Sequence, residues 1–214
     1  MTTLIESLRG GLIVSCQPKP DSPFQTPRAM ALFARAAEMG GACAIRAKGA
    51  AHIRAIHHAV GLPIVGLVKI ASALPVYITP TLYSARPLAR AGAAIIATDA
   101  TCRARPGGLG LPIMADVATV EEGLAAADAG ASLVATTMAG YTDARPLTEG
   151  PDLDVLEALA ARCSAPVICE GRVSSPHDVQ AAFNAGAYAV VVGTAITNPT
   201  AVVRMFVAAT RGHT

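Results

Sequence analysis

Residues 166–197 read PVICEGRVSSPHDVQAAFNAGAYAVVVGTAIT and contain one complete strand–helix–strand unit. The run at 166–170 is apolar almost throughout rather than alternating, which is typical of a parallel strand buried on both faces. Ser175 stands directly before a proline, and a capping hydroxyl followed by proline predicts a helix start. Gly186 predicts the end of that helix, shortly before a second apolar run at 189–193. The stretch therefore indicates two parallel strands joined by a helix.

The same order of apolar run, helical stretch and glycine recurs along the whole chain. Further helix starts are predicted at Thr26 and Asn198, each followed by proline. Helix ends are predicted at Gly40, Gly61, Gly92 and Gly130. Strands are predicted over residues 12–16, 42–46, 63–69, 94–99, 112–116, 132–137, 166–170 and 189–193. Such alternation allows a doubly wound sheet or a closed barrel, and eight repeats favour one (β/α)8 TIM-barrel domain over residues 1–214.

Two segments differ from the regular repeat. Leu4 and Leu8 share one helical face, which predicts a short N-terminal helix covering the bottom of the barrel. Residues 100–111, ATCRARPGGLGL, leave no room for a full helix, so we expect the fourth outer helix to be truncated or missing. An apolar patch at that gap predicts a homodimer, unless Leu109 and Leu111 fold back and cover the gap within one chain.

Composition and charge exclude several classes of function. The 17 basic and 15 acidic residues are scattered, without the basic run that nucleic acid or an anionic membrane would attract. Aromatic residues make up 4% of the chain, so the stacking surfaces of single-strand binders are not expected. No cluster of His, Cys and carboxylate side chains suggests a metal site. The first ten residues lack a long apolar stretch, so we expect no membrane anchor and a cytoplasmic location.

Polar residues interrupt the apolar runs mainly where the predicted strands end. In a TIM barrel the C-terminal ends of all strands meet at one rim, where enzymes with this fold keep their chemistry. A single polar residue at a strand end is as often an ordinary surface group as an active-site residue, but the whole set indicates an active site. The set comprises Gln17, Arg46, Lys69, Asp99, Asp116, Thr136, Thr137, Glu170 and Arg172.

Lys69 and Glu170 are the candidate catalytic residues. Lys69 is one of three lysines and closes the apolar run PIVGLVK, where desolvation would lower its pKa as a general base or Schiff-base nucleophile requires. The alternative is a lysine that reaches solvent. Glu170 closes PVICE and could give or take a proton, or could form a structural ion pair with Arg46 or Lys69.

The loops after the seventh and eighth predicted strands are candidates for phosphate binding. This fold commonly holds phosphate there, with backbone N–H groups and a helix N-terminus facing the anion. Gly171, Arg172, Gly193 and Thr194 occupy these positions. Glycines by themselves could simply mark tight turns. The presence of glycine in both neighbouring loops is what favours phosphate binding.

Stretches from residue 10 to residue 199 resemble the N-acetylmannosamine-6-phosphate 2-epimerases of bacterial amino-sugar and sialic acid catabolism. The matching stretches are GGLIVSCQ, IRA, PIVGLVK, VYITPT, TDAT, IMADVATVEEG, TTMAGYT, PVICEGRV and VVGTAIT. Together they are specific, although no single one is. Ile70-Ala71-Ser72 departs from the family's usual Arg-Asp-Tyr after the lysine, and Asn198 stands where the family usually has arginine.

The resemblance implies interconversion of N-acetylmannosamine 6-phosphate and N-acetylglucosamine 6-phosphate through loss and return of the C2 proton, without metal or organic cofactor. It implies that Lys69 and Glu170 are the proton-transfer pair. The residues that it implies for holding the sugar are Gln17, Arg46, Asp116 and Thr137. Two alternatives stay open: a Schiff-base lyase or aldolase acting on a sugar phosphate, and a phosphate-binding barrel subunit without catalysis.

Overall fold

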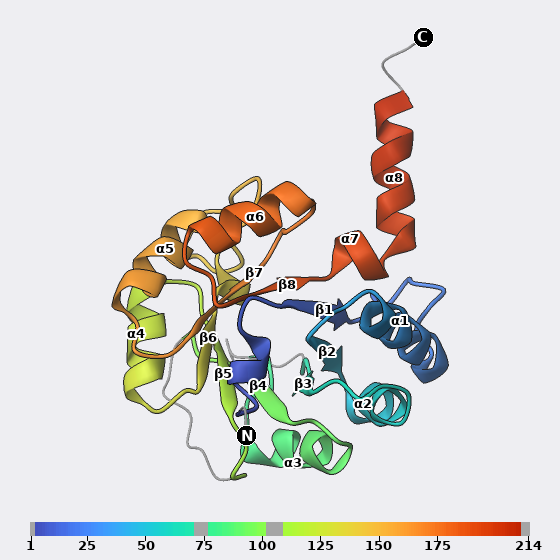
Figure 1. Cartoon of the computed structure of the whole chain (residues 1–214), viewed down its shortest axis with the longest axis horizontal. Helices are drawn as coiled ribbons and strands as arrows, with labels where there is room; N and C mark the ends of the chain where they lie inside the picture. Colours follow the sequence, from blue (N-terminus) through green and yellow to red (C-terminus); the bar gives the residue numbers. More distant parts are fainter. Residues whose placement is uncertain (1–2, 71–76, 102–108, 211–214) are drawn as a thin grey trace.

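The computed structural model describes residues 3–70, 77–101 and 109–210, and its eight parallel strands close into a barrel (Figure 1). Each strand pairs with the next, and β8 returns to β1 with Ile13 opposite Val191. The predicted TIM barrel is therefore confirmed. The strands are β1 Leu12–Cys16, β2 Ala44–Lys48, β3 Ile64–Leu67, β4 Ile95–Asp99, β5 Ile113–Asp116, β6 Leu133–Ala135, β7 Val167–Glu170 and β8 Ala189–Val192.

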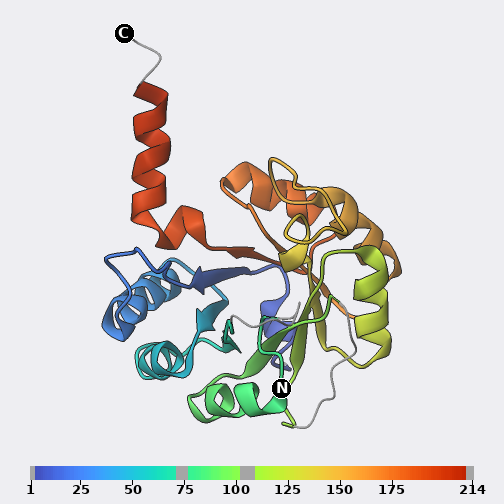
Figure 2. The same ribbon diagram turned by 180° about the vertical axis from the view of Figure 1, so that it is seen from behind.

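Helices surround the barrel and begin at the predicted caps (Figures 1 and 2). The Thr26 side chain accepts the N–H of Ala29, Ser175 forms a capping box with Asp178, and Asn198 Oδ1 accepts the N–H of Ala201. The α-helices are α1 Pro27–Met39, α2 Ala50–His57, α3 Leu82–Arg90, α4 Val120–Asp128, α5 Leu153–Arg162, α6 Pro176–Asn184, α7 Thr194–Thr197 and α8 Pro199–Thr210. Two 3-10 turns complete the description, η1 Glu6–Leu8 and η2 Thr136–Met138.

Glycines end the helices largely as expected. Gly92, Gly130 and Gly186 have φ values of 106°, 91° and 91°, the left-handed region that only glycine enters cheaply. After α1 the left-handed residue is Gly41 rather than the predicted Gly40, because Gly40 still belongs to the last helical turn. Gly61 does not adopt this conformation and instead donates its N–H to Glu38 Oε1 at 2.7 Å.

The core has an inner and an outer part. Inward side chains such as Leu67 and Ile95 fill the barrel, and further apolar clusters lie between the strands and helices. The expected N-terminal helix is the short turn η1, whose Leu8 is fully buried against the inner cluster. The bottom of the barrel is therefore closed, which leaves the C-terminal rim for a site.

The segment between β4 and β5 was expected to lack a full helix and to expose an apolar patch. Residues 102–108 lie outside the described residues, so the expected truncation is not described. Leu109 and Leu111 pack against the outer cluster beside α1–α3, and Ile95 is fully buried. The two leucines thus pack as expected if the chain folds back over this gap.

Three strand ends differ from the prediction by two residues each. β2 continues to Lys48, so Arg46 lies inside the strand instead of at its end. β3 stops at Leu67, and Lys69 pairs with Ile78 in a short antiparallel bridge beyond it. β6 stops at Ala135 and its two threonines form η2. An apolar run alone does not show where a strand gives way to a paired loop.

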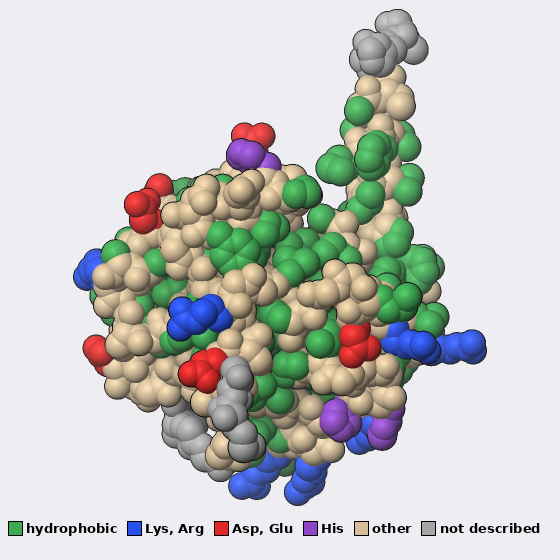
Figure 3. Space-filling model, viewed as in Figure 1, with side chains coloured by type: hydrophobic (Ala, Val, Ile, Leu, Met, Phe, Trp, Pro, Cys, Tyr) green, Lys and Arg blue, Asp and Glu red, His purple; other side chains and the backbone are tan. Residues whose placement is uncertain are grey.

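Helix α8 projects away from the barrel in both ribbon views (Figures 1 and 2). None of its residues is buried, although it carries apolar side chains along its length (Figure 3). Val203, Met205 and Phe206 are 59%, 59% and 68% exposed. None of the helices in the described part of the chain has the length and apolar character needed to cross a bilayer.

Candidate active site

A cavity of about 580 Å³ opens at the C-terminal rim of the barrel. Residues at the ends of, or directly after, β1, β2, β3, β6, β7 and β8 line it, so side chains far apart in the sequence meet there. Of the ten predicted site residues, Arg46 and Asp116 do not line this cavity. The eight that do are Gln17, Lys69, Thr137, Glu170, Gly171, Arg172, Gly193 and Thr194.

The side chain of Arg46 points into the barrel interior and is 1% exposed. Its Nη2 donates to Asp116 Oδ2 at 2.7 Å, and its Nε lies 3.0 Å from Glu170 Oε1 as an ion pair without hydrogen-bond geometry. The group thus joins β2, β5 and β7 and compensates two buried carboxylates. Arg46 and Asp116 fix the position of Glu170 from behind the cavity wall.

The carboxyl group of Glu170 is buried and has a raised pKa. Burial raises the pKa of its carboxyl to about 7; the nearby Arg46 charge opposes this rise and the Asp116 charge adds to it. Its Oε2 atom is buried and has no hydrogen-bond partner among the described residues. A carboxyl group with this pKa is divided between its two protonation states near neutral pH.

Lys69 is exposed toward the cavity and lies two residues after the end of β3, where it pairs with Ile78. Its Nζ lies 5.9 Å from the ring centre of Tyr77, which lines the same cavity. The surrounding walls still desolvate the ammonium, and this lowers the pKa of Lys69; the positive charge of Arg46 lowers it further. A larger fraction of Lys69 is consequently neutral at a given pH than for an isolated lysine.

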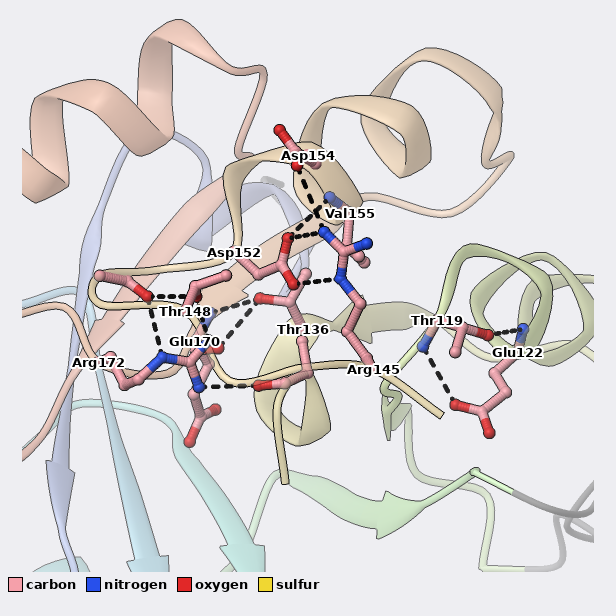
Figure 4. Close-up of polar contacts among 12 residues, drawn as sticks. Thr119, Glu122, Thr136, Arg145, Thr148, Asp152, Asp154, Val155, Glu170 and Arg172 are labelled. Carbon is pink, nitrogen blue, oxygen red and sulfur yellow. Dashed lines mark hydrogen bonds and ion pairs between the residues drawn. The ribbon is translucent and has the colours of Figure 1, made fainter. Parts of the chain in front are cut away.

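The two threonines of η2 join neighbouring strands beneath the cavity. Thr137 Oγ1 donates to Asp116 Oδ1 at 2.6 Å. Thr136 Oγ1 accepts the N–H of Glu170 at 3.1 Å and donates to its carbonyl at 3.0 Å (Figure 4). This turn therefore fixes the backbone of Glu170 and the side chain of Asp116.

Arg172 holds a loop beside the cavity. Its guanidinium donates to the Ala139 carbonyl at 2.8 Å, to the Gly150 carbonyl at 2.9 Å and to Thr148 Oγ1 at 2.7 Å (Figure 4). The same group lies 5.3 Å from the ring centre of Tyr141. Its side chain is thus committed to the loop, and its backbone remains for a ligand.

A second ion pair fixes the far end of that loop. Arg145 contacts Asp152 through Nε at 2.7 Å and Nη2 at 2.8 Å, and Asp152 also caps α5 (Figure 4). Together with Arg172, it holds both sides of the segment that carries Tyr141.

The predicted phosphate loops present free backbone donors. None of the described residues accepts a hydrogen bond from the backbone N–H of Gly171, Gly193 or Thr194. Gly171 has φ 118°, which only glycine adopts without strain. A Cβ at Gly193 would lie 3.3 Å from Ser15 Cβ, so the loop after β8 approaches β1 closely. Both loops border the same cavity.

Sequence reasoning missed several residues of the cavity. Lys19, Lys48, Tyr77, Tyr141 and Asn198 line it without having been predicted. The two missed lysines could have been predicted, because the chain has only three lysines and Lys19 and Lys48 follow the predicted strands 12–16 and 42–46 within three residues. No group of metal-binding side chains occurs within the described ranges.

Comparison with known proteins agrees with the sequence motifs. The family model for N-acetylmannosamine-6-phosphate epimerase, NanE, matches residues 30–212. The chain belongs to this family. A Cutibacterium acnes relative named as an N-acetylmannosamine-6-phosphate 2-epimerase is 45% identical over 95% of each chain. The solved structure of the N-acetylmannosamine-6-phosphate 2-epimerase from Clostridium perfringens is 37% identical, with a TM-score of 0.90 over 96% of this chain and 95% of that one.

A second relative and a distant structure place this family in context. A Caldanaerobacter subterraneus relative with the same enzyme name is 44% identical over 95% of this chain and 92% of its own. Thiamine phosphate pyrophosphorylase from Pyrococcus furiosus is 16% identical with a TM-score of 0.61 over 91% of this chain and 90% of that one, and shares the fold alone.

Proposed function

We propose that the chain interconverts N-acetylmannosamine 6-phosphate and N-acetylglucosamine 6-phosphate by deprotonation and reprotonation at C2. The observation that carries the proposal is the placement of Lys69 and Glu170 on one cavity. Lys69 follows β3 and Glu170 is the last residue of β7; these strands lie four apart in either direction around the closed barrel. The two groups thus approach a bound substrate from opposite sides, as inversion at one carbon requires.

The chemistry suits the protonation behaviour of the two groups. Opening of the sugar ring gives an aldehyde, which acidifies the neighbouring C2–H bond. One group removes this proton to leave a planar enolate, and the other returns a proton to the opposite face. The lowered pKa of Lys69 and the raised pKa of Glu170 bring both within reach of neutral pH. In the reverse reaction the two groups exchange roles.

The remaining predicted residues are assigned by their place around the cavity. Gln17 and Thr137 line it and are proposed to contact the sugar; Gln17 Oε1 is buried without a hydrogen-bond partner among the described residues. Arg46 and Asp116 are proposed to act indirectly, by holding Glu170 and Thr137.

The 6-phosphate is proposed to bind at the loops after β7 and β8. The free backbone donors of Gly171, Gly193 and Thr194 support this assignment, because phosphate binds readily to converging N–H groups. Arg172 contributes its backbone and the position of the loop. A cytoplasmic location is proposed with it, since a sugar phosphate is charged and does not cross membranes unaided.

We also propose that the chain forms a homodimer, with α8 as part of the contact. Its apolar residues Val203, Met205 and Phe206 have no cover from their own barrel. An exposed apolar surface of this kind usually marks an interface. The expected patch near Leu109 does not support the dimer, because Leu109 packs onto its own outer cluster.

Proton NMR in D2O tests the reaction. With N-acetylmannosamine 6-phosphate, we expect signals of N-acetylglucosamine 6-phosphate to appear while the C2 proton is replaced by deuterium. Absence of both conversion and exchange would reject the proposal. Borohydride added with substrate separates it from Schiff-base chemistry, since a lyase or aldolase would trap a covalent adduct detectable by mass spectrometry and an epimerase would not.

A further inference from the structure

All three lysines of the chain, Lys19, Lys48 and Lys69, line the same cavity. Arg172 lines it too, and Glu170 is the one acidic residue among the lining residues in the described part of the chain. The chain as a whole has nearly balanced charge, with 17 basic and 15 acidic residues. The cavity is therefore more cationic than the rest of the protein, and an anionic ligand accounts for this excess.

Two of these four cationic side chains are already assigned to other roles. The guanidinium of Arg172 makes three hydrogen bonds to the 139–150 loop. Lys69 belongs to the proton-transfer pair with Glu170. The remaining cations are Lys48, the last residue of β2, and Lys19 in the loop after β1.

The loop that carries Lys19 is held against the end of β2. Lys48 Nζ lies 3.5 Å from the Pro18 carbonyl oxygen. The ring nitrogens of His52 contact the carbonyl oxygens of Lys48 at 3.0 Å and Gln25 at 2.8 Å. The Lys48 ammonium and the loop that carries Lys19 thus lie in one sector of the rim, beside β1.

This sector adjoins the predicted phosphate loop. β1 pairs with β2 on one side and β8 on the other. Thr197 Oγ1 donates to the Ser15 carbonyl at 2.7 Å and lies 3.1 Å from the Gly193 carbonyl oxygen, which ties the loop after β8 to β1. A phosphate at Gly193 would therefore have the two lysines across a single strand.

We infer that Lys48, with Lys19 beside it, binds the phosphate of the substrate and sets the preference for a phosphorylated over a neutral sugar. The inference rests on the proposed function and adds a residue to it. An ammonium acts on a phosphate dianion as a compact point charge and makes charge-assisted hydrogen bonds to its oxygens. Asn198, which borders the same cavity, brings no charge, so the cationic contribution comes from the lysines.

The test compares Lys48→Met, which keeps the side-chain length without charge, with Lys48→Arg, which keeps the charge. In Lys48→Met we expect KM for N-acetylmannosamine 6-phosphate to rise about tenfold with kcat little changed, as loss of one charge-assisted contact predicts. KM for unphosphorylated N-acetylmannosamine should not change. Lys48→Arg should stay within about threefold of the wild type.

A binding measurement separates this inference from the reaction. Calorimetry with inorganic phosphate requires no turnover, and we expect its Kd to rise about tenfold in Lys48→Met but not in Lys48→Arg. If the wild type binds phosphate in this way but shows no epimerisation, the proposed function fails and the lysine site stands. The inference would be overturned if KM rose equally for the phosphorylated and the neutral sugar, or if the Kd for phosphate did not change. Lys48 would then act only through its contact with the Pro18 carbonyl.

Discussion

Arg46 Nε lies 3.0 Å from Glu170 Oε1 although Arg46 is 1% exposed, so the cation beside the proposed catalytic carboxyl lies beneath the cavity and does not line it. Removing Arg46 should therefore alter proton transfer without removing a substrate contact. Its charge lowers the pKa of both Glu170 and Lys69. The two groups are electrostatically linked through this one side chain.

Arg46→Met should move the pH optimum of kcat/KM to higher pH, because the pKa values of Glu170 and Lys69 both rise when the cation is lost. The variant should also lose about 3–5 kcal/mol of stability, since Asp116 and Glu170 are left unpaired in the wall. Urea denaturation measures the second effect. A rate lowered equally at every pH would mean that Arg46 is only structural, and Arg46→Lys, which keeps the charge, should shift the optimum less.

Glu170→Gln should become more stable relative to the wild type as pH rises. The folded pKa of Glu170, about 7, lies above its ordinary value of 4.5. Between these values the native state holds a proton that the unfolded state has released, so rising pH favours unfolding of the wild type. The difference in Tm between variant and wild type should therefore widen from about pH 4.5 to 7 and then level off. Parallel Tm curves over this range would contradict the raised pKa.

The sequence predicted the barrel because most strand–helix repeats contain local signals, namely an apolar run, a capping residue before the helix or a glycine after it. The place of Lys69 and Glu170 on the rim cavity could be predicted because each closes an apolar run. Arg46 was misplaced, since no local signal distinguishes a charge at a strand end from one inside β2 that is compensated by β5 and β7. Such compensation depends on strands that are distant in the sequence.

The helix after Asn198 was predicted from its cap, but its detachment from the barrel was not. Apolar residues along a helix indicate that it packs against something, without saying against what. Lys19 and Lys48 were likewise missed, because their meeting point at the rim depends on the closure of β1 onto β2 and β8.

Lys69→Met should abolish epimerisation while leaving the fold intact, because the side chain is exposed to the cavity and has no buried ion-pair partner among the described residues. Loss of an acid–base group typically lowers the rate by about 10²–10⁴-fold. Proton NMR measures the rate, and circular dichroism with the thermal transition checks the fold. Arg54→Met, at an exposed position of α2 outside the cavity lining, is the matched control and should keep the wild-type kcat and KM. Activity of Lys69→Met above roughly a tenth of the wild type would remove Lys69 from the mechanism.

Phe206→Glu should convert a dimer into a monomer, because it places a charge in the middle of the apolar surface of α8, where Phe206 is 68% exposed and contributes to no core of its own chain. A stable contact would bury on the order of 1,000 Å² or more in total. Tyr83→Glu on α3 is the matched control, since Tyr83 is 86% exposed on a helix that packs onto the barrel, and this variant should stay dimeric. Sedimentation at micromolar concentration measures both. A wild type that sediments as a 21.7 kDa monomer would reject the dimer, and a dimer that survives Phe206→Glu would place its contact away from α8.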